Sequence, residues 1–162
     1  MKISKNWLKE YLDLSNITDE ELHAKINSHV CEIETYKKLV EATNLTIGYV
    51  HECVMHPDSD HLHVCQVEIR PGEITQIVCG APNVDKGQKV IVALPGCELH
   101  GGTIKNSKIR GVESNGMICS LSELGIDARF QTEEQKAGIE ILPADAPIGE
   151  EALSYMGLKD TI

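Results

Sequence analysis

The sequence predicts a mainly β protein that begins with an α-rich segment. From Leu45 onwards, short runs rich in Val and Ile alternate with Pro, Gly and Asn, a texture typical of a small all-β barrel or sandwich. Before that point, apolar residues recur at helical spacing behind residues that can cap a helix. Aromatic residues make up only 4% of the chain, so the core must be built mostly from aliphatic side chains.

Residues 1–38 are expected to hold two helices and one strand. Ser4 can cap a short helix whose apolar side includes Trp7. Thr18 and Glu21 form a Thr-x-x-Glu capping box at the start of a second helix. Residues 31–36 alternate between apolar and polar side chains, which predicts a strand.

Five strands are expected after this segment, at residues 45–55, 62–69, 74–79, 89–94 and 139–143. In the second run, Leu62 and Val64 share one face, whereas Cys65 and Val67 share the other. A β-bulge or a bend within this run would allow both sets to be buried. Residues 120–125 are expected to form a short turn or helix, docked through Leu121 and Leu124. The polar stretch 130–137 is expected to be a surface loop.

Composition and charge bound the class of protein. The 162 residues suffice for one domain, or for a small domain with an appendage. Fifteen Lys and Arg against 25 Asp and Glu give a net charge of −10, whereas a nucleic-acid-binding protein usually carries a basic surface. The six cysteines are dispersed without a CxxC pair, and neither a secretory signal nor a membrane-spanning run is visible. A cytoplasmic protein with reduced thiols is expected, with no membrane partner.

Four blocks of the sequence stand out in order: HPDSDHLHVCQV at 56–67, IVCGAPNV at 77–84, VALPG at 92–96 and IRGVESNGMICS at 109–120. Together they resemble the tRNA-binding OB domain. Four ordered blocks are far more specific than one short motif. The resemblance implies a five-stranded OB barrel at 40–150 that binds tRNA.

The opening residues, MKISKNWLKEY, are similar to the start of the bacterial phenylalanyl-tRNA synthetase β subunit, and CEIE at 31–34 resembles its G-x-E-V-E segment. This leader argues against a free-standing tRNA-binding protein. The resemblance implies an N-terminal fragment of a longer chain. In it, residues 1–39 and 151–162 belong to one discontinuous domain, with the OB domain inserted between them.

The resemblance also implies partners and cofactors. The family enzyme is an α2β2 heterotetramer that charges tRNA(Phe) with phenylalanine using ATP and Mg²⁺. Its aminoacylation site lies on the α subunit. We therefore expect tRNA(Phe), the α subunit and the remainder of β as partners, and neither a catalytic site nor a cofactor in this fragment. No nucleophile elbow, P-loop or dinucleotide fingerprint is present in the sequence.

The candidate RNA-binding surface is a short cationic run. Lys105, Lys108 and Arg110 lie within six residues that contain no acid, and cationic side chains bind phosphates. Lys86 and Lys89 could join them from a neighbouring strand. Three uncharged residues are further candidates. Ser114 and Asn115 could form hydrogen bonds with RNA, and Met117 could make an apolar contact.

Two observations favour the alternative of a structural or protein-interaction module with little RNA affinity. Between residues 39 and 150, 16 Asp and Glu oppose 8 Lys and Arg, which gives −8. His61 and His63 stand where the family often has Lys and Arg. His and Cys residues cluster at positions 51–65 and suggest a metal site, but their spacing does not match a structural zinc motif. We predict no metal.

Overall fold

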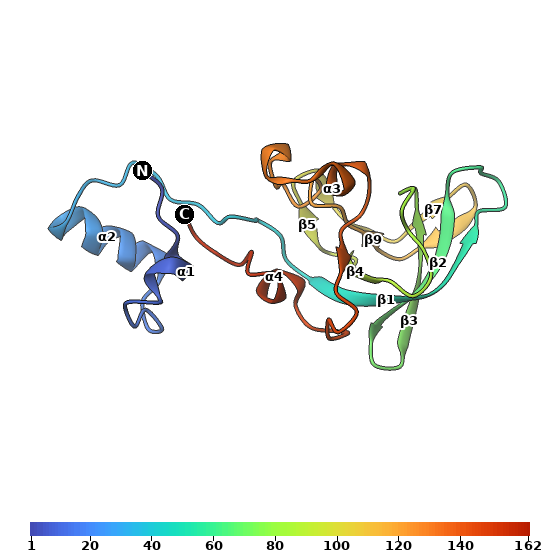
Figure 1. Ribbon diagram of the computed structural model, residues 1–162, viewed down its shortest axis with the longest axis horizontal. Coiled ribbons are helices and arrows are strands. Elements are labelled where there is room, and N and C mark those ends of the chain that lie inside the picture. The colour runs from blue at the N-terminus through green and yellow to red at the C-terminus, as the bar shows by residue number, and fades with distance from the viewer. The chain divides into compact units, whose positions relative to one another are not determined.

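The computed structural model describes residues 1–162, which form two compact units. The first unit contains Met1–Val40 and Gly157–Ile162, and the second contains Glu41–Met156. Strands outnumber helices in the second unit (Figure 1), which confirms the prediction of a mainly β protein with OB-like character. No helix is both long and apolar enough to cross a membrane.

The first unit contains the two expected helices, and both begin where the sequence predicts. Helix α1 spans Lys5–Leu8, and the Ser4 hydroxyl accepts a hydrogen bond from the Trp7 amide at 3.0 Å. Helix α2 spans Asp19–His29 and opens with the reciprocal Thr18–Glu21 capping box. The caps satisfy amide groups that have no partner within a helix.

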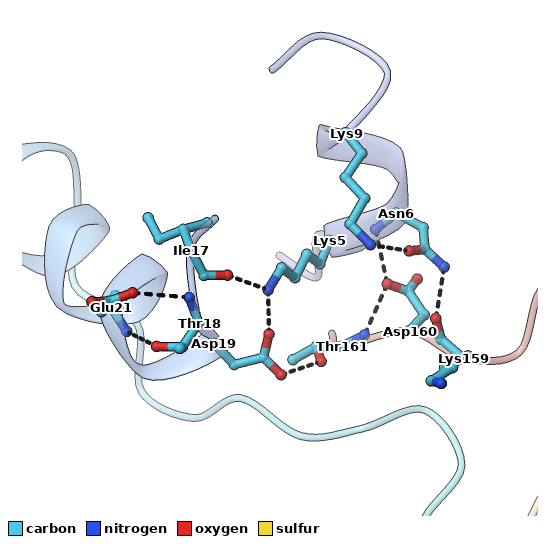
Figure 2. A network of polar contacts seen from close by, with 10 residues as sticks. All are labelled: Lys5, Asn6, Lys9, Ile17, Thr18, Asp19, Glu21, Lys159, Asp160 and Thr161. Atoms are coloured by element: carbon cyan, nitrogen blue, oxygen red, sulfur yellow. Dashed lines mark hydrogen bonds and ion pairs between the residues drawn. The ribbon is translucent and has the colours of Figure 1, made fainter. Parts of the chain in front are cut away.

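A polar network ties the start of the first unit to residues 157–162, as Figure 2 shows. The Asp19 carboxylate accepts from the Lys5 ammonium and, at 2.7 Å, from the Thr161 hydroxyl. The Asp160 carboxylate accepts from the Asn6 backbone amide at 2.8 Å. Residues 142 and 154 positions apart in the sequence are thereby fixed to each other.

The strand predicted at residues 31–36 is absent, which corrects that expectation. Backbone pairing begins only at Lys37, whose amide donates to the Ile162 carbonyl at 2.9 Å. A single bridge joins Lys38 to Thr161. Residues 31–36 alternate as a strand would, but a strand needs a hydrogen-bonding neighbour, and the returning segment reaches only residues 37–39.

The second unit is built on a curled antiparallel sheet with the order β10-β4-β1-β2-β3, and β9 also pairs with β4. The five strands of that path coincide with the five predicted runs; they are β1 (Leu45–Met55), β2 (His63–Arg70), β3 (Glu73–Cys79), β4 (Lys89–Ala93) and β10 (Ile141–Leu142). Strand β9 (Met117–Ile118) completes the sheet.

The sheet curls through β-bulges and one close approach. Strand β1 has an extra residue at His51, and β2 has one at Ile69. No bulge lies at residues 62–65, contrary to one reading of that run, because β2 begins after Leu62 and Val64 stays half-exposed. At Gly48, an added Cβ would come within 2.8 Å of the Val67 and Val92 side chains. A side chain at position 48 would therefore clash with Val67 on β2 and Val92 on β4, the two strands that flank β1.

The core of the second unit is aliphatic, as the composition predicts. Its fully buried members come from the inward faces of the central strands; they include Val50, Cys65, Val67, Ile77, Val90 and Val92. Leu121 and Leu124 are also buried, which confirms that the turn at 120–125 docks through them. Four of the six free cysteines are buried, whereas Cys31 is exposed.

Smaller elements accompany the sheet. Two hairpins are formed by β5 (Glu98–Leu99) with β6 (Gly102–Thr103), and by β7 (Ser107–Ile109) with β8 (Val112–Ser114). Three short helices follow; they are η1 (Ala128–Phe130), α3 (Glu133–Ala137) and α4 (Ala152–Tyr155). The loop predicted at 130–137 is thus partly helical, because Thr132 and Gln135 form a second capping box.

Candidate nucleic-acid interface

A groove of about 710 Å³ opens on the second unit. Five segments line it: residues 78–82 at the end of β3, residues 103–109 up to β7, residues 114–118 around β9, residues 120–123 at the turn, and residues 136–139 at the end of α3. Its floor and walls include apolar side chains such as Pro82, Met117 and Ile139. An apolar groove with polar groups at its rim is a common form of binding site.

Lys105 lines this groove, and Lys108 is exposed on β7 nearby. Lys108 lies directly across the hairpin from Glu113. Neither ammonium group takes part in an ion pair or hydrogen bond in the structure. Both are therefore available to a phosphate.

Arg110 is exposed, but its guanidinium is already in use within the protein. Its Nη1 atom donates to the Asp58 carbonyl oxygen at 2.7 Å. Arg110 also lies in the left-handed region with φ 48°, which is uncommon for a residue other than glycine. Arg110 therefore differs from Lys105 and Lys108, because its charged group already bonds within the protein.

The three uncharged candidates have different environments. Ser114 is 1% exposed, and its hydroxyl accepts from the Val78 amide at 3.0 Å and donates to the Gly116 carbonyl at 3.3 Å. Asn115 is half-buried, and its backbone amide donates to the Gln76 carbonyl. Ser114 and Met117 both line the groove. Because Ser114 is almost fully buried and its hydroxyl is already bonded, Met117 is the one of the three whose side chain a ligand in the groove would meet.

Lys86 and Lys89 do not line the groove. Lys86 is exposed in the turn before β4. Lys89 is half-buried; its ammonium donates to the Ala146 carbonyl at 2.7 Å and lies 5.6 Å from the centre of the Tyr49 ring. The groove and these two lysines are therefore distinct features.

Sequence reasoning missed Lys136, which lines the groove from α3. Its ammonium pairs with Glu133 at 2.7 Å. A second groove residue, Glu123, accepts from the Ser120 amide and hydroxyl. The capping box at Thr132 could have predicted the helix, but no local pattern could have placed it beside the groove.

The histidines and cysteines at 51–65 serve separate contacts. His51 pairs with Glu68 at 2.6 Å, and His61 pairs with Asp60 at 2.9 Å. The Cys53 and Cys65 sulfur atoms are 3.8 Å apart, and burial raises the pKa of both thiols. Three or more His, Cys, Asp or Glu side chains do not converge on one point anywhere in residues 1–162.

Comparison with known proteins identifies the family of the second unit, which carries the groove. Residues 45–151 match the family model described as "Putative tRNA binding domain". The chain belongs to the tRNA-binding domain family. In this tRNA-binding domain, the matched range covers β1 to β10 and every segment that lines the groove.

Relatives extend the similarity to the whole chain. The chain is 49% identical, over all of its length, to the phenylalanine–tRNA ligase beta subunit of Lactiplantibacillus plantarum and 46% identical to that of Geobacillus kaustophilus. It spans 20% of the length of each. A solved structure, a MetRS related protein from Pyrococcus horikoshii, is 25% identical with a TM-score of 0.48, over 67% of this chain and 87% of that one.

One residue of the IVCGAPNV block in this tRNA-binding domain fixes a groove wall without lining the groove itself. Asn83 bonds both backbone groups of Ile139, at 3.0 Å and 2.9 Å. An added Cβ on Gly138 would lie 2.0 Å from the Asn83 oxygen. The far wall of the groove is thus fixed by a long-range clip between Asn83 and Ile139.

Proposed function

We propose that this chain is the tRNA-binding and architectural part of phenylalanine–tRNA ligase, which charges tRNA(Phe) with phenylalanine using ATP. The observation that carries the proposal is 49% identity across the entire chain to a phenylalanine–tRNA ligase beta subunit, together with the tRNA-binding family match at 45–151. ATP and Mg²⁺ belong to the full enzyme in this proposal. The chain itself supplies RNA contacts and structure.

The groove is the surface on which we place the RNA. Lys105 and Lys108 carry free ammonium groups at or beside it, and Met117 offers an apolar contact for a base. Each phosphate that a cation neutralises contributes about 0.7 to 0.9 to the slope of log affinity against log salt. Two free lysines support weak, salt-sensitive binding, in which the rest of the enzyme supplies most of the affinity.

The architectural role is supported by the first unit. Residues 1–39 and 151–162 are proposed as parts of a discontinuous domain that the remainder of the β subunit completes within an α2β2 enzyme. Large apolar side chains of this segment are exposed, among them Trp7 at 52% and Tyr11 at 70%. The relatives are about five times as long, so chain that could cover such residues follows this region in them.

A second candidate is an OB module that contributes structure or protein contacts and little RNA affinity. The charge of −8 across residues 39–150 favours it. So do internal contacts that engage five of the eight cations, which are Arg70, Lys89, Arg110, Arg129 and Lys136.

A binding titration distinguishes the two candidates. The chain is titrated with tRNA(Phe) at about 50 mM and 200 mM salt, alongside a Lys105→Ala/Lys108→Ala variant and a Lys25→Ala/Lys37→Ala control that removes the same charge elsewhere. The RNA-binding proposal predicts salt-sensitive binding that the first variant weakens and the control retains. Equal loss in both variants would indicate non-specific charge, and absence of binding by the parent chain would favour the second candidate.

A further inference from the structure

Two loops that are far apart in the sequence are clasped together beside the groove. The first, residues 56–62, joins β1 to β2, and the second is the turn of the β7–β8 hairpin; Figure 1 shows the hairpin next to that loop. Three hydrogen bonds between His56, Asp58, Ile109 and Arg110 form the clasp.

His56 is the centre of the clasp and is only 2% exposed. Its Nδ1 atom accepts from the Asp58 backbone amide at 3.0 Å. Its Nε2 atom lies 3.0 Å from the Ile109 carbonyl oxygen, which can only accept. The proton must therefore reside on Nε2, so the two partners fix both the tautomer and the orientation of the ring.

Arg110 closes the clasp from the other side. Its guanidinium donates to the carbonyl of Asp58, the same residue whose amide is held by His56. Arg110 and Gly111 form the two-residue turn, with φ of 48° and 83°. Such turns favour Asn or Gly at the first position, so an arginine there accepts an unfavourable backbone conformation that its side-chain contact can offset.

The hairpin is thereby held at both ends. At its base, the Gln76 side chain on β3 donates to the Glu113 carbonyl at 2.8 Å. The Gln76 backbone carbonyl accepts from the Asn115 amide, also at 2.8 Å. At its tip, His56 and Arg110 hold Ile109 and the turn. A two-stranded hairpin this short is marginally stable alone. Its contacts with the rest of the unit, including those at the tip beside Ile109, therefore fix the position of Lys108.

We propose that His56 and Arg110 are positioning residues that hold the β7–β8 hairpin, and with it Lys108, in place for RNA, and that Arg110 does not itself bind a phosphate. The proposal rests on the proposed RNA-binding function. It differs from a simple reading of the cationic run, in which Lys105, Lys108 and Arg110 are equivalent phosphate ligands.

Hydrogen exchange in the absence of RNA tests the clasp itself. His56→Asn keeps an acceptor near Nδ1 but loses the donor to Ile109, whereas His56→Gln places an amide donor near Nε2. Exchange at the β7–β8 amides is expected to rise at least tenfold in His56→Asn and Arg110→Ala, and to stay near the parent value in His56→Gln. Arg110 is exposed, and Arg110→Ala removes the guanidinium while keeping a Cβ at the positive-φ position, so it remains informative if a His56 variant fails to fold. Unchanged hairpin exchange in Arg110→Ala would overturn the clasp.

Salt dependence of tRNA(Phe) binding by the 162-residue chain tests the division of roles. Lys108→Ala should reduce the slope of log affinity against log salt by about 0.7 to 0.9, the value for one lost phosphate contact. Arg110→Ala should weaken binding several-fold in the parent chain, because it displaces Lys108, and should not lower the slope further in the Lys108→Ala background. A further slope reduction of about 0.7 to 0.9 on adding Arg110→Ala to Lys108→Ala would show that Arg110 binds its own phosphate and would refute the positioning role. If the parent chain binds no RNA, the proposed function and the RNA role of the clasp both fail, while hydrogen exchange still decides whether the clasp exists.

Discussion

The side-chain amide of Asn83 forms both backbone hydrogen bonds of Ile139 that a neighbouring strand would otherwise form. Its Nδ2 atom donates to the Ile139 carbonyl at 3.0 Å, and its Oδ1 atom accepts from the Ile139 amide at 2.9 Å. Gly138 lies so close to the Asn83 side-chain amide that a Cβ at residue 138 would stand 2.0 Å from the Asn83 Oδ1 atom. The clip is therefore possible only because residue 138 has no side chain.

This relationship predicts a strongly non-additive pair of substitutions. Asn83→Ala should lower the free energy of unfolding by about 1–3 kcal/mol, because it leaves the half-buried Ile139 backbone groups unpaired. Gly138→Ala should cost a similar amount by displacing the Asn83 amide. In the Asn83→Ala background, Gly138→Ala should cost little. Denaturant unfolding of the cycle checks this, with Gly101→Ala as the control, since a Cβ there meets nothing. Additive costs would contradict the clip.

Acid should loosen the first unit through Asp19. The hydrogen bond from Lys5, followed by that from Thr161, lowers the pKa of the Asp19 carboxyl. A carboxyl whose pKa is lowered by folding contributes stability above its ordinary pKa, and that contribution disappears as the pH falls through the folded value. NMR signals of residues 1–30 should therefore lose dispersion as the pH falls below about 4.

Asp19→Asn provides the check on this assignment. It should lower the stability of the first unit at neutral pH and remove most of the acid sensitivity. Asp13→Asn is a matched control, because the Asp13 pKa is lowered only by local contacts with Ser15. Acid sensitivity that persists unchanged in Asp19→Asn would assign the effect to another group.

The thiols should react in two classes. Cys31 is exposed, whereas burial raises the pKa of the Cys65, Cys79 and Cys119 thiols and so removes the reactive thiolate. Brief treatment of the native chain with iodoacetamide should modify Cys31 first, and the buried cysteines should react only in denaturant. Intact mass and peptide mapping check this order. Rapid native modification of Cys65 would contradict the packing of β2.

Gly48 should resist substitution because it lies where the sheet curls. A Cβ would approach the Val67 and Val92 side chains to 2.8 Å, so Gly48→Ala should cost about 1–3 kcal/mol of stability. Adding Val92→Ala should recover part of that loss, since it removes one of the two contacted side chains. Thermal denaturation of the single and double variants checks the expectation, which a fully tolerated Gly48→Ala would contradict.

The main strands could be predicted because their signals are local. Alternating aliphatic residues and turn residues locate β1 to β4, and capping boxes locate the starts of helices. Strands β5 to β9 contain two or three residues each, too few to show alternation. Residues 31–36 alternate and still form no strand, because pairing depends on a partner that the pattern does not describe.

The candidate site was predictable only in part, because its key contacts are long-range. Arg110 looks like a phosphate ligand in the sequence, and its bond to Asp58, 52 positions earlier, appears only in the fold. Ser114 looks like a surface donor, but its hydroxyl satisfies the Val78 amide inside the unit. Lys136 reaches the groove through the segment that Asn83 holds, which no local pattern indicates.

The most direct test of the account is an amide NMR titration of the 162-residue chain with tRNA(Phe). The account predicts that shifts and broadening concentrate on the groove segments, at residues 78–82, 103–109, 114–118, 120–123 and 136–139, and spare the β2–β3 turn at Gly72. Perturbations centred away from these segments, or none at tRNA concentrations that saturate the full enzyme, would contradict the claim that this groove is where the protein meets RNA.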